Sequence, residues 1–156
     1  MRRNDREITD AARIDEIIGR CDCCRLGLVC AGRAYIVPLN FGYRREAGKG
    51  VFYFHSAREG CKIDLIKKGG DASFELDTNH LLHPGALACA HSFRFQSVMG
   101  TGTVRILEEE RARREALEVI MEHVTGRGGW TFEEKALGAV ALLRLEVSEM
   151  TCKEHK

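Results

Sequence analysis

The sequence lacks the features that mark membrane proteins, exported proteins and nucleic-acid-binding proteins. No apolar run approaches the roughly 18 residues that a membrane-spanning helix needs, and the charged start, with Arg2, Arg3, Asp5 and Arg6, leads into no signal-peptide core. Neither sign of charge dominates, because 24 Lys and Arg face 23 Asp and Glu for a net charge of +1. We therefore expect a cytoplasmic protein that binds neither membranes nor nucleic acid, since the latter requires a basic patch or stripe.

Several catalytic signatures are also missing. The serines lie in no G-x-S-x-G elbow, and the chain has neither a G-x-G-x-x-G fingerprint nor a Walker loop. Glu108, Glu109 and Glu110 are better explained as the start of a helix than as acid/base catalysts. These absences argue against a serine hydrolase and against the common nucleotide-binding folds.

Cysteine, in contrast, is abundant. The seven cysteines form an odd set, and in a cytosolic chain we expect them to be free thiols rather than a disulfide framework. Cys21, Cys23 and Cys24 cluster without the paired C-x-x-C spacing of zinc sites, so a metal or redox role remains only an alternative there. Cys24 is expected to face the core where a strand begins.

The hydrophobic pattern predicts a single α+β domain over residues 1–156, built as a mainly antiparallel β-barrel with peripheral helices. Asp10 should cap a helix that buries Ile14, Ile17 and Ile18. Pro38 cannot donate to a ladder and marks an edge, a bulge or a place where a ligand replaces a neighbouring strand. Strands are expected at 26–30, 34–41, 51–54, 72–78, 93–107 and 140–147, helices at 59–68 and 108–124, and polar loops at 42–50 and 79–85.

The helix expected at 108–124 has two further features. Leu117, Ile120, Met121 and Val124 form its apolar stripe, and Glu109–Arg113 and Glu110–Arg114 are spaced as ion pairs. After it, residues 131–134 (Thr-Phe-Glu-Glu) read as a capping box for a short helix.

The junction from Tyr53 to Lys62 predicts an anion site. An aromatic strand runs through Ser56 into a short helix, whose first N–H groups, together with Arg58 and Lys62, can hold a phosphate. The alternative is that Ser56 only caps the helix.

A second candidate site is the run His80, His83, Cys89 and His91. Four soft or borderline ligands within 12 residues could bind zinc or haem iron, although their spacing matches no standard zinc module. The alternative is a loop whose histidines are partly exposed or line a pocket.

Three segments in this order resemble the pyridoxamine 5′-phosphate oxidase-related flavoproteins, with the nitroimidazole-resistance (Nim) reductases as the nearest branch. They are residues 35–43 (Tyr-Ile-Val-Pro-Leu-Asn-Phe-Gly-Tyr), 53–65 (Tyr-Phe-His-Ser-Ala-Arg-Glu-Gly-Cys-Lys-Ile-Asp-Leu) and 96–102 (Gln-Ser-Val-Met-Gly-Thr-Gly). The similarity extends over essentially the whole chain.

The resemblance implies a split β-barrel that binds FMN at a homodimer interface. It places Val37, Pro38, Leu39 and Asn40 along the flavin ring, His55, Ser56 and Ala57 along the ribityl chain and ring, and Lys62 at the phosphate. It adds Gln96 and Ser97 from the long strand, and Trp130 of the partner subunit over the ring. Asn40 could instead end a strand, Trp130 could be plain core, and His55 could be a buried, satisfied histidine.

The implied activity is that of an FMN-dependent oxidoreductase that reduces a small electron-poor substrate such as a nitroimidazole or nitroaromatic. His55 is then the catalytic candidate, to orient the substrate or supply a proton. Two alternatives remain: a haem- or metal-binding barrel of the same fold, and a flavin-binding protein without catalysis. Cys61 stands where relatives commonly carry Lys or Arg, which removes one expected phosphate contact, and Phe95 stands where a Tyr is common.

Overall fold

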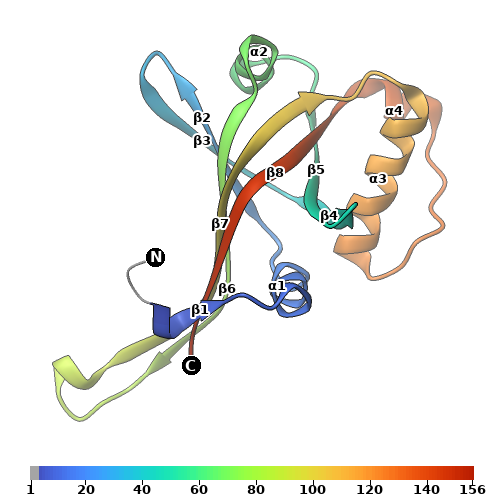
Figure 1. The fold of residues 1–156 in the computed structure, drawn as a ribbon. Coiled ribbons are helices and arrows are strands. Elements are labelled where there is room, and N and C mark those ends of the chain that lie inside the picture. Colours follow the sequence, from blue (N-terminus) through green and yellow to red (C-terminus); the bar gives the residue numbers. More distant parts are fainter. Residues whose placement is uncertain (1–3) are drawn as a thin grey trace.

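The computed structural model describes residues 4–156, so the expectations for Arg2 and Arg3 lie outside it. Over that range the chain forms one sheet of eight strands and four α-helices (Figure 1). The strands are β1 (Glu7–Ile8), β2 (Cys24–Cys30), β3 (Arg33–Leu39), β4 (Phe41–Glu46), β5 (Lys49–Ala57), β6 (Asp71–His83), β7 (Ser92–Ile106) and β8 (Val140–His155). The helices are α1 (Ala11–Ile18), α2 (Cys61–Lys68), α3 (Glu110–Thr125) and α4 (Glu134–Ala139), with short 3-10 turns at Asn4–Arg6 and Ala88–Ala90.

The sheet is antiparallel throughout and strongly bent. Its order is β3-β2-β6-β7-β8-β5-β4, with β1 added beside β8. The two edge strands β3 and β4 are separated in sequence by Asn40 alone, and no pairing joins them within residues 4–156. The barrel is therefore split rather than closed, which confirms the predicted fold class. Pro38 lies on an edge strand, as its missing N–H requires.

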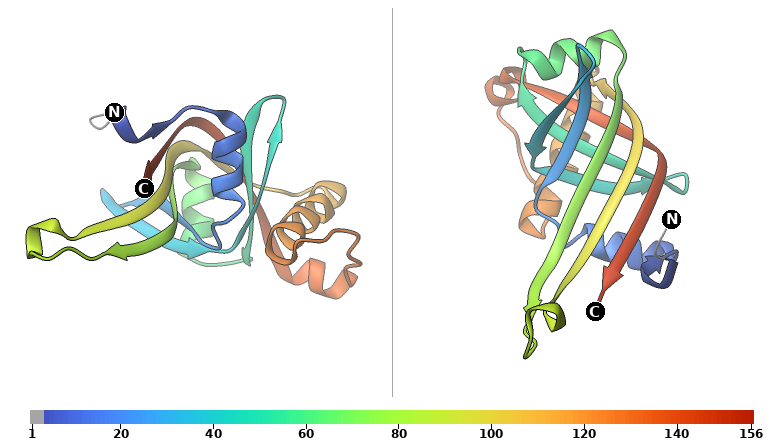
Figure 2. Two further views of the ribbon diagram at one scale, coloured as in Figure 1. Left: turned by 90° about the horizontal axis from the view of Figure 1, so that it is seen from below. Right: turned by 90° about the vertical axis from the view of Figure 1, so that its left-hand side faces the viewer.

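The core fills the inside of the bent sheet. Phe52, Phe54 and Leu143 are fully buried there, and Ile63 and Ile66 of α2 pack against the same cluster. A second, smaller layer lies outside β5 and β8, where α3 covers Val51, Tyr53 and Leu142. Figure 2 shows that α3 and α4 lie to one side of the sheet, while the outer faces of β2, β6 and β7 carry no helix over much of their length.

Several local predictions are confirmed. Asp10 caps α1 by accepting the Arg13 N–H at 2.8 Å, and Ile14, Ile17 and Ile18 are buried. Cys24 is fully buried at the start of β2. On α3, Arg114 donates to Glu110 at 3.1 Å. No helix of the described residues is both long enough and apolar enough to cross a membrane.

The strands are longer than the sequence indicates. The predicted loop at 42–50 contains β4, a tight turn and the start of β5, and β5 continues through Ala57. The predicted loop at 79–85 is largely an extension of β6 to His83, reached through a register shift between Thr78 and Leu81. Cross-strand partners hold these polar residues in strands, and a single sequence does not reveal such partners.

The helix starts also differ from the prediction. Ser56 lies inside β5 and caps nothing, because α2 begins at Cys61 after Gly60. The capping box at Thr131 does not form, since α4 starts at Glu134 without a side-chain cap. The stripe predicted for α3 is rotated: Ala116 and Val119 join Ile120 in the core.

Val124 of that stripe is 58% exposed. Among the described residues the Arg113 side chain forms no ion pair with Glu109. It instead donates to the carbonyls of Leu107, Leu137 and Val140 at 2.6 to 3.3 Å. This guanidinium ties the start of α3 to the end of α4.

Two glycines of β7 allow strands to approach inside one chain. A Cβ at Gly100 would lie 2.3 Å from the Glu149 carbonyl oxygen, and one at Gly102 would lie 2.2 Å from that of Glu146. Between them the pairing with β8 shifts and leaves Ser148 without a partner on β7. These glycines allow β7 to bend where it crosses β8 and β6.

Candidate functional site

The start of α2 offers an uncapped helix N-terminus. Gly60, the residue before the helix, has φ of +116° and no side chain accepts the first N–H groups of the helix. Lys62 lies half-buried in the first turn. A helix start of this kind binds anions through its N–H groups and dipole, and Lys62 adds a positive charge. Arg58 does not join it, because its guanidinium donates to the Gly138 carbonyl at 2.8 Å.

The end of β5 leads into this helix start. His55, Ser56 and Ala57 pair with Leu142, Ala141 and Val140 of β8. Neighbouring side chains in a strand point to opposite faces, so His55 and Ser56 face opposite sides of the sheet. The hydroxyl of Ser56 donates to the Ala57 carbonyl at 2.8 Å. His55 is exposed, so its alternative reading as a buried core histidine is wrong.

The β3 edge supplies a second wall. Val37 and Leu39 turn their side chains to the core, while Pro38 is exposed. The outer edge of β3 pairs with no other strand of the described sheet, so its backbone groups there remain free for a ligand. Asn40, just beyond the strand, is exposed and donates from Nδ2 to the Asp22 carbonyl at 3.1 Å. In Figure 1, α2 lies between the β2–β3 hairpin and the end of β5.

Gln96 and Ser97 lie apart from these groups, in the first half of β7. Gln96 is 1% exposed, and its Nε2 donates to Glu154. Its Oε1 has no hydrogen-bond partner among the described residues. An unpaired buried acceptor is costly, so this oxygen is available for a donor that the protein chain does not supply. Ser97 faces the opposite side, beside Met99, Thr151 and Lys153.

Trp130 lies after α3, on the side of the molecule that α3 covers. Its indole N–H donates to the Arg127 carbonyl at 2.9 Å, and the Arg127 guanidinium stacks over the ring at 3.8 Å. The ring is half-buried, so it is not plain core. Within one chain, the structure thus joins the β5 end to the helix start that carries Lys62, and α2 lies beside the β2–β3 hairpin in Figure 1. It leaves Gln96, Ser97 and Trp130 elsewhere.

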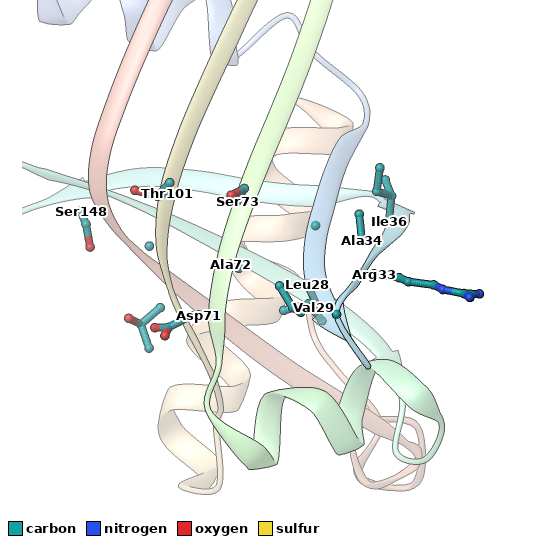
Figure 3. A pocket seen from close by; sticks show the side chains of 14 residues that line it. Leu28, Val29, Arg33, Ala34, Ile36, Asp71, Ala72, Ser73, Thr101 and Ser148 are labelled. Carbon is teal, nitrogen blue, oxygen red and sulfur yellow. The ribbon is translucent and has the colours of Figure 1, made fainter.

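A separate groove of about 590 Å³ crosses the outer face of the sheet (Figure 3). Small residues of neighbouring strands line it, including Gly27, Ser73 and Thr101, with Val29 and Ile36 at its β2–β3 side. The last two side chains are 71% and 64% exposed. None of the sequence-predicted site residues lines this groove.

Sequence reasoning missed a charged cluster on the outer face of β4, β5 and β8. Glu46 accepts hydrogen bonds from Arg44 and Arg144, each at 2.7 Å, and from the hydroxyl of Tyr53, which is 3% exposed. Burial opposes ionisation of Glu46, but these three donors outweigh it and lower its pKa from 4.5 to about 2. The alternation of Arg and Glu in both β4 and β8 is the sequence pattern that could have predicted this cluster.

The four candidate metal ligands between residues 80 and 91 do not come together around one point. His80 pairs with Asp77 at 2.8 Å, and His91 contacts the Leu87 carbonyl at 3.0 Å through Nδ1. Within residues 4–156, no group of three or more His, Cys, Asp or Glu side chains is arranged to hold a metal ion. His80, His83, Cys89 and His91 instead lie exposed on the extended β6–β7 hairpin.

The architecture defines the class as a split-barrel α+β protein. The model of the pyridoxamine 5′-phosphate oxidase family matches residues 10–154, and the chain belongs to that family. Among curated proteins, no match was found.

Solved structures share this fold. A candidate 5-nitroimidazole antibiotic resistance protein from Bacteroides thetaiotaomicron is 32% identical with a TM-score of 0.81, over 95% of this chain and 86% of that one. The FAD and heme binding protein of Mycobacterium smegmatis shares the fold at 18% identity and a TM-score of 0.80, over 97% of this chain and 74% of that one. The flavocytochrome Anf3 from Azotobacter vinelandii also shares the fold, at 20% identity and a TM-score of 0.79, over 100% of this chain and 72% of that one.

Proposed function

We propose that the protein binds FMN and uses it to reduce a small electron-poor organic molecule, such as a nitroimidazole or nitroaromatic compound. The observation that carries the proposal is the uncapped α2 N-terminus, with Lys62 in its first turn, directly after the end of β5. The family membership and the 5-nitroimidazole resistance relative support the same function.

The residues present fit a flavin mononucleotide. The phosphate requires an anion site, which the α2 start and Lys62 offer. The ring requires hydrogen-bonding groups at its edge, which free β3 backbone beside Pro38 offers.

The proposed site is completed by a second copy of the chain. The outer faces of β2, β6 and β7 carry no helix over much of their length, and they present Val29 and Met99 to the surface. A homodimer through this face would cover those side chains. It would also turn Ser97, which lies beside Met99 on this face, toward the partner subunit.

His55 is the catalytic candidate. When bound, the flavin supplies the electron-transfer chemistry, which leaves the protein to bind, orient and protonate. His55 is exposed at the end of β5, beside the proposed flavin site. It can therefore donate a hydrogen bond to a substrate oxygen and supply a proton as charge accumulates there.

The test begins with the visible spectrum of the purified protein, followed by titration with FMN, FAD and haem. We expect a flavin spectrum and tighter binding of FMN than of FAD. Turnover of a nitroimidazole should follow when a reductant is added. A colourless protein that binds no added flavin would refute the proposal, and a Soret band without flavin absorption would favour the haem-binding alternative. Flavin binding without turnover of any acceptor would favour a non-catalytic flavin protein.

A further inference from the structure

Two cysteines from distant parts of the sequence meet at the start of α2. Cys30 is the last residue of β2 and is half-buried, whereas Cys61 is the first residue of α2 and is exposed. The helix packs against β2, and the two thiols lie close enough to interact with each other. Both are free.

We propose that Cys30 and Cys61 form a reversible disulfide when the protein meets a hydroperoxide. The thiolate of Cys61, the exposed partner, attacks the peroxide oxygen and releases water, which leaves a sulfenic acid. The Cys30 thiol then attacks that sulfur and displaces a second water. In total two thiols lose two hydrogens, and one hydrogen peroxide is reduced to two waters.

The surroundings of Cys61 set the speed of this reaction. Partial desolvation, the Cys30 thiol and Asp64 raise the pKa of Cys61, and Lys68 acts in the opposite direction. The thiolate is the reactive form, so the rate should increase from pH 7 to pH 9. Because Cys61 is exposed and no side chain caps the helix start, the peroxide can reach the thiol from solvent.

A bridge at this position would tie the β2–β3 hairpin to α2. The hairpin leads directly into the β3 edge, and α2 carries Lys62 next to Cys61. If FMN binds as proposed above, the crosslink joins the two walls of its site, so bound FMN should leave the oxidised protein more slowly. This second consequence rests on the proposed function, whereas the disulfide itself does not.

The test uses the full-length, flavin-free protein, reduced and then treated with a small excess of hydrogen peroxide. Trypsin cleavage should yield residues 26–33 joined to residues 59–62, two peptides with one cysteine each. Cys30→Ser and Cys61→Ser should each abolish this product. Cys89→Ser, which removes another exposed thiol, should leave it unchanged. Oxidation of Cys61 alone to sulfinic acid, or its linkage to another cysteine or to a second chain, would overturn the proposal.

A second measurement separates the disulfide from the flavin site. Stopped-flow release of FMN should be about tenfold slower from the oxidised protein, and a thiol reductant should restore the original rate. Release from Cys61→Ser should be insensitive to peroxide. A mapped disulfide in a protein that binds no FMN would support the bridge and refute only the flavin function. A protein that binds FMN but yields only unlinked peptides would refute the bridge and support only the flavin function.

Discussion

Lys62 lies half-buried in the first turn of α2, and the residue before it is the uncharged Cys61. With Arg58 directed to Gly138, Lys62 is the basic side chain of this turn that can bind a phosphate. The remaining contacts would come from backbone N–H groups. Phosphate binding at this site should therefore depend strongly on this one side chain.

Replacing Lys62 by Ala should weaken FMN binding about tenfold or more, because a charge-assisted hydrogen bond contributes about 1.5–3 kcal/mol. Isothermal titration or flavin fluorescence quenching measures the change. Lys67→Ala, in the exposed last turn of the same helix, is the matched control and should bind FMN normally. Unchanged affinity in Lys62→Ala would place the phosphate elsewhere.

The Glu46 carboxylate predicts an acid dependence of stability. Its pKa is about 2 in the folded protein and 4.5 ordinarily, so its contribution is complete above pH 4.5 and disappears as the pH falls toward 2. Its side chain is 30% exposed, and solvent screening reduces the effect.

At pH 7, Glu46→Gln should lower the free energy of unfolding by about 1 kcal/mol. Urea titrations of both proteins at pH 7 and pH 3 measure this difference, which should be smaller at pH 3. Glu149→Gln, an exposed carboxylate on β8, is the control. A difference that stays constant with pH would show that Glu46 contributes through packing alone.

At the scale of elements, α3 is seated directly on the backbone of β4. A Cβ at Gly42 would lie 2.5 Å from the Ile120 nitrogen and from the Val119 carbonyl carbon. The helix therefore approaches the strand as closely as it does only because Gly42 has no side chain.

Gly42→Ala should force α3 outward and cost about 1–3 kcal/mol, as overpacking typically does. The midpoint of thermal unfolding should fall by several degrees. Gly138→Ala in α4 is the matched substitution, since a Cβ there meets nothing within 4 Å and the site should tolerate it. A native midpoint for Gly42→Ala would mean that α3 shifts without cost.

The sequence was most informative where burial follows a regular period. Ile63 and Ile66 identified α2, and the length and bend of β7 followed from its β-branched residues and glycines. It was least informative where a polar strand is held by a distant partner. The pairing of His83 with Ser92 and the seating of Gln96 against Glu154 depend on chain segments that no local pattern connects.

The candidate site shows the same division. The motifs predicted Lys62, the β5 end and the β3 edge as one group; in the structure the β5 end leads into the helix start that carries Lys62, and β3 is an unpaired edge strand. Motif order could not show that Arg58 turns away, that Ser56 stays within β5, or that Gln96 faces the barrel interior. Those orientations depend on which face of its strand each side chain occupies and on the residue at which each element ends.

At the scale of the whole molecule, the uncovered sheet face is the proposed dimer surface. Met99 lies on β7 at this face and is 55% exposed. Met99→Glu should give a monomer in sedimentation velocity and should lose FMN affinity at the same time, because a buried charge without a partner opposes association. Val124→Glu, an equally exposed apolar position on α3, is the control. A dimer that persists in Met99→Glu would place the interface elsewhere.

The central position of β8 has a consequence for how the protein is made. This strand lies between β7 and β5 and also pairs with β1, yet it is synthesised after all three. Until β8 emerges from the ribosome, the hydrogen-bonding edges of β5 and β7 have no partner to join, so the two halves of the sheet cannot unite. Folding must therefore wait for residues 140–155 and close many distant pairings together, which predicts slow, late folding and a dependence on chaperones during synthesis.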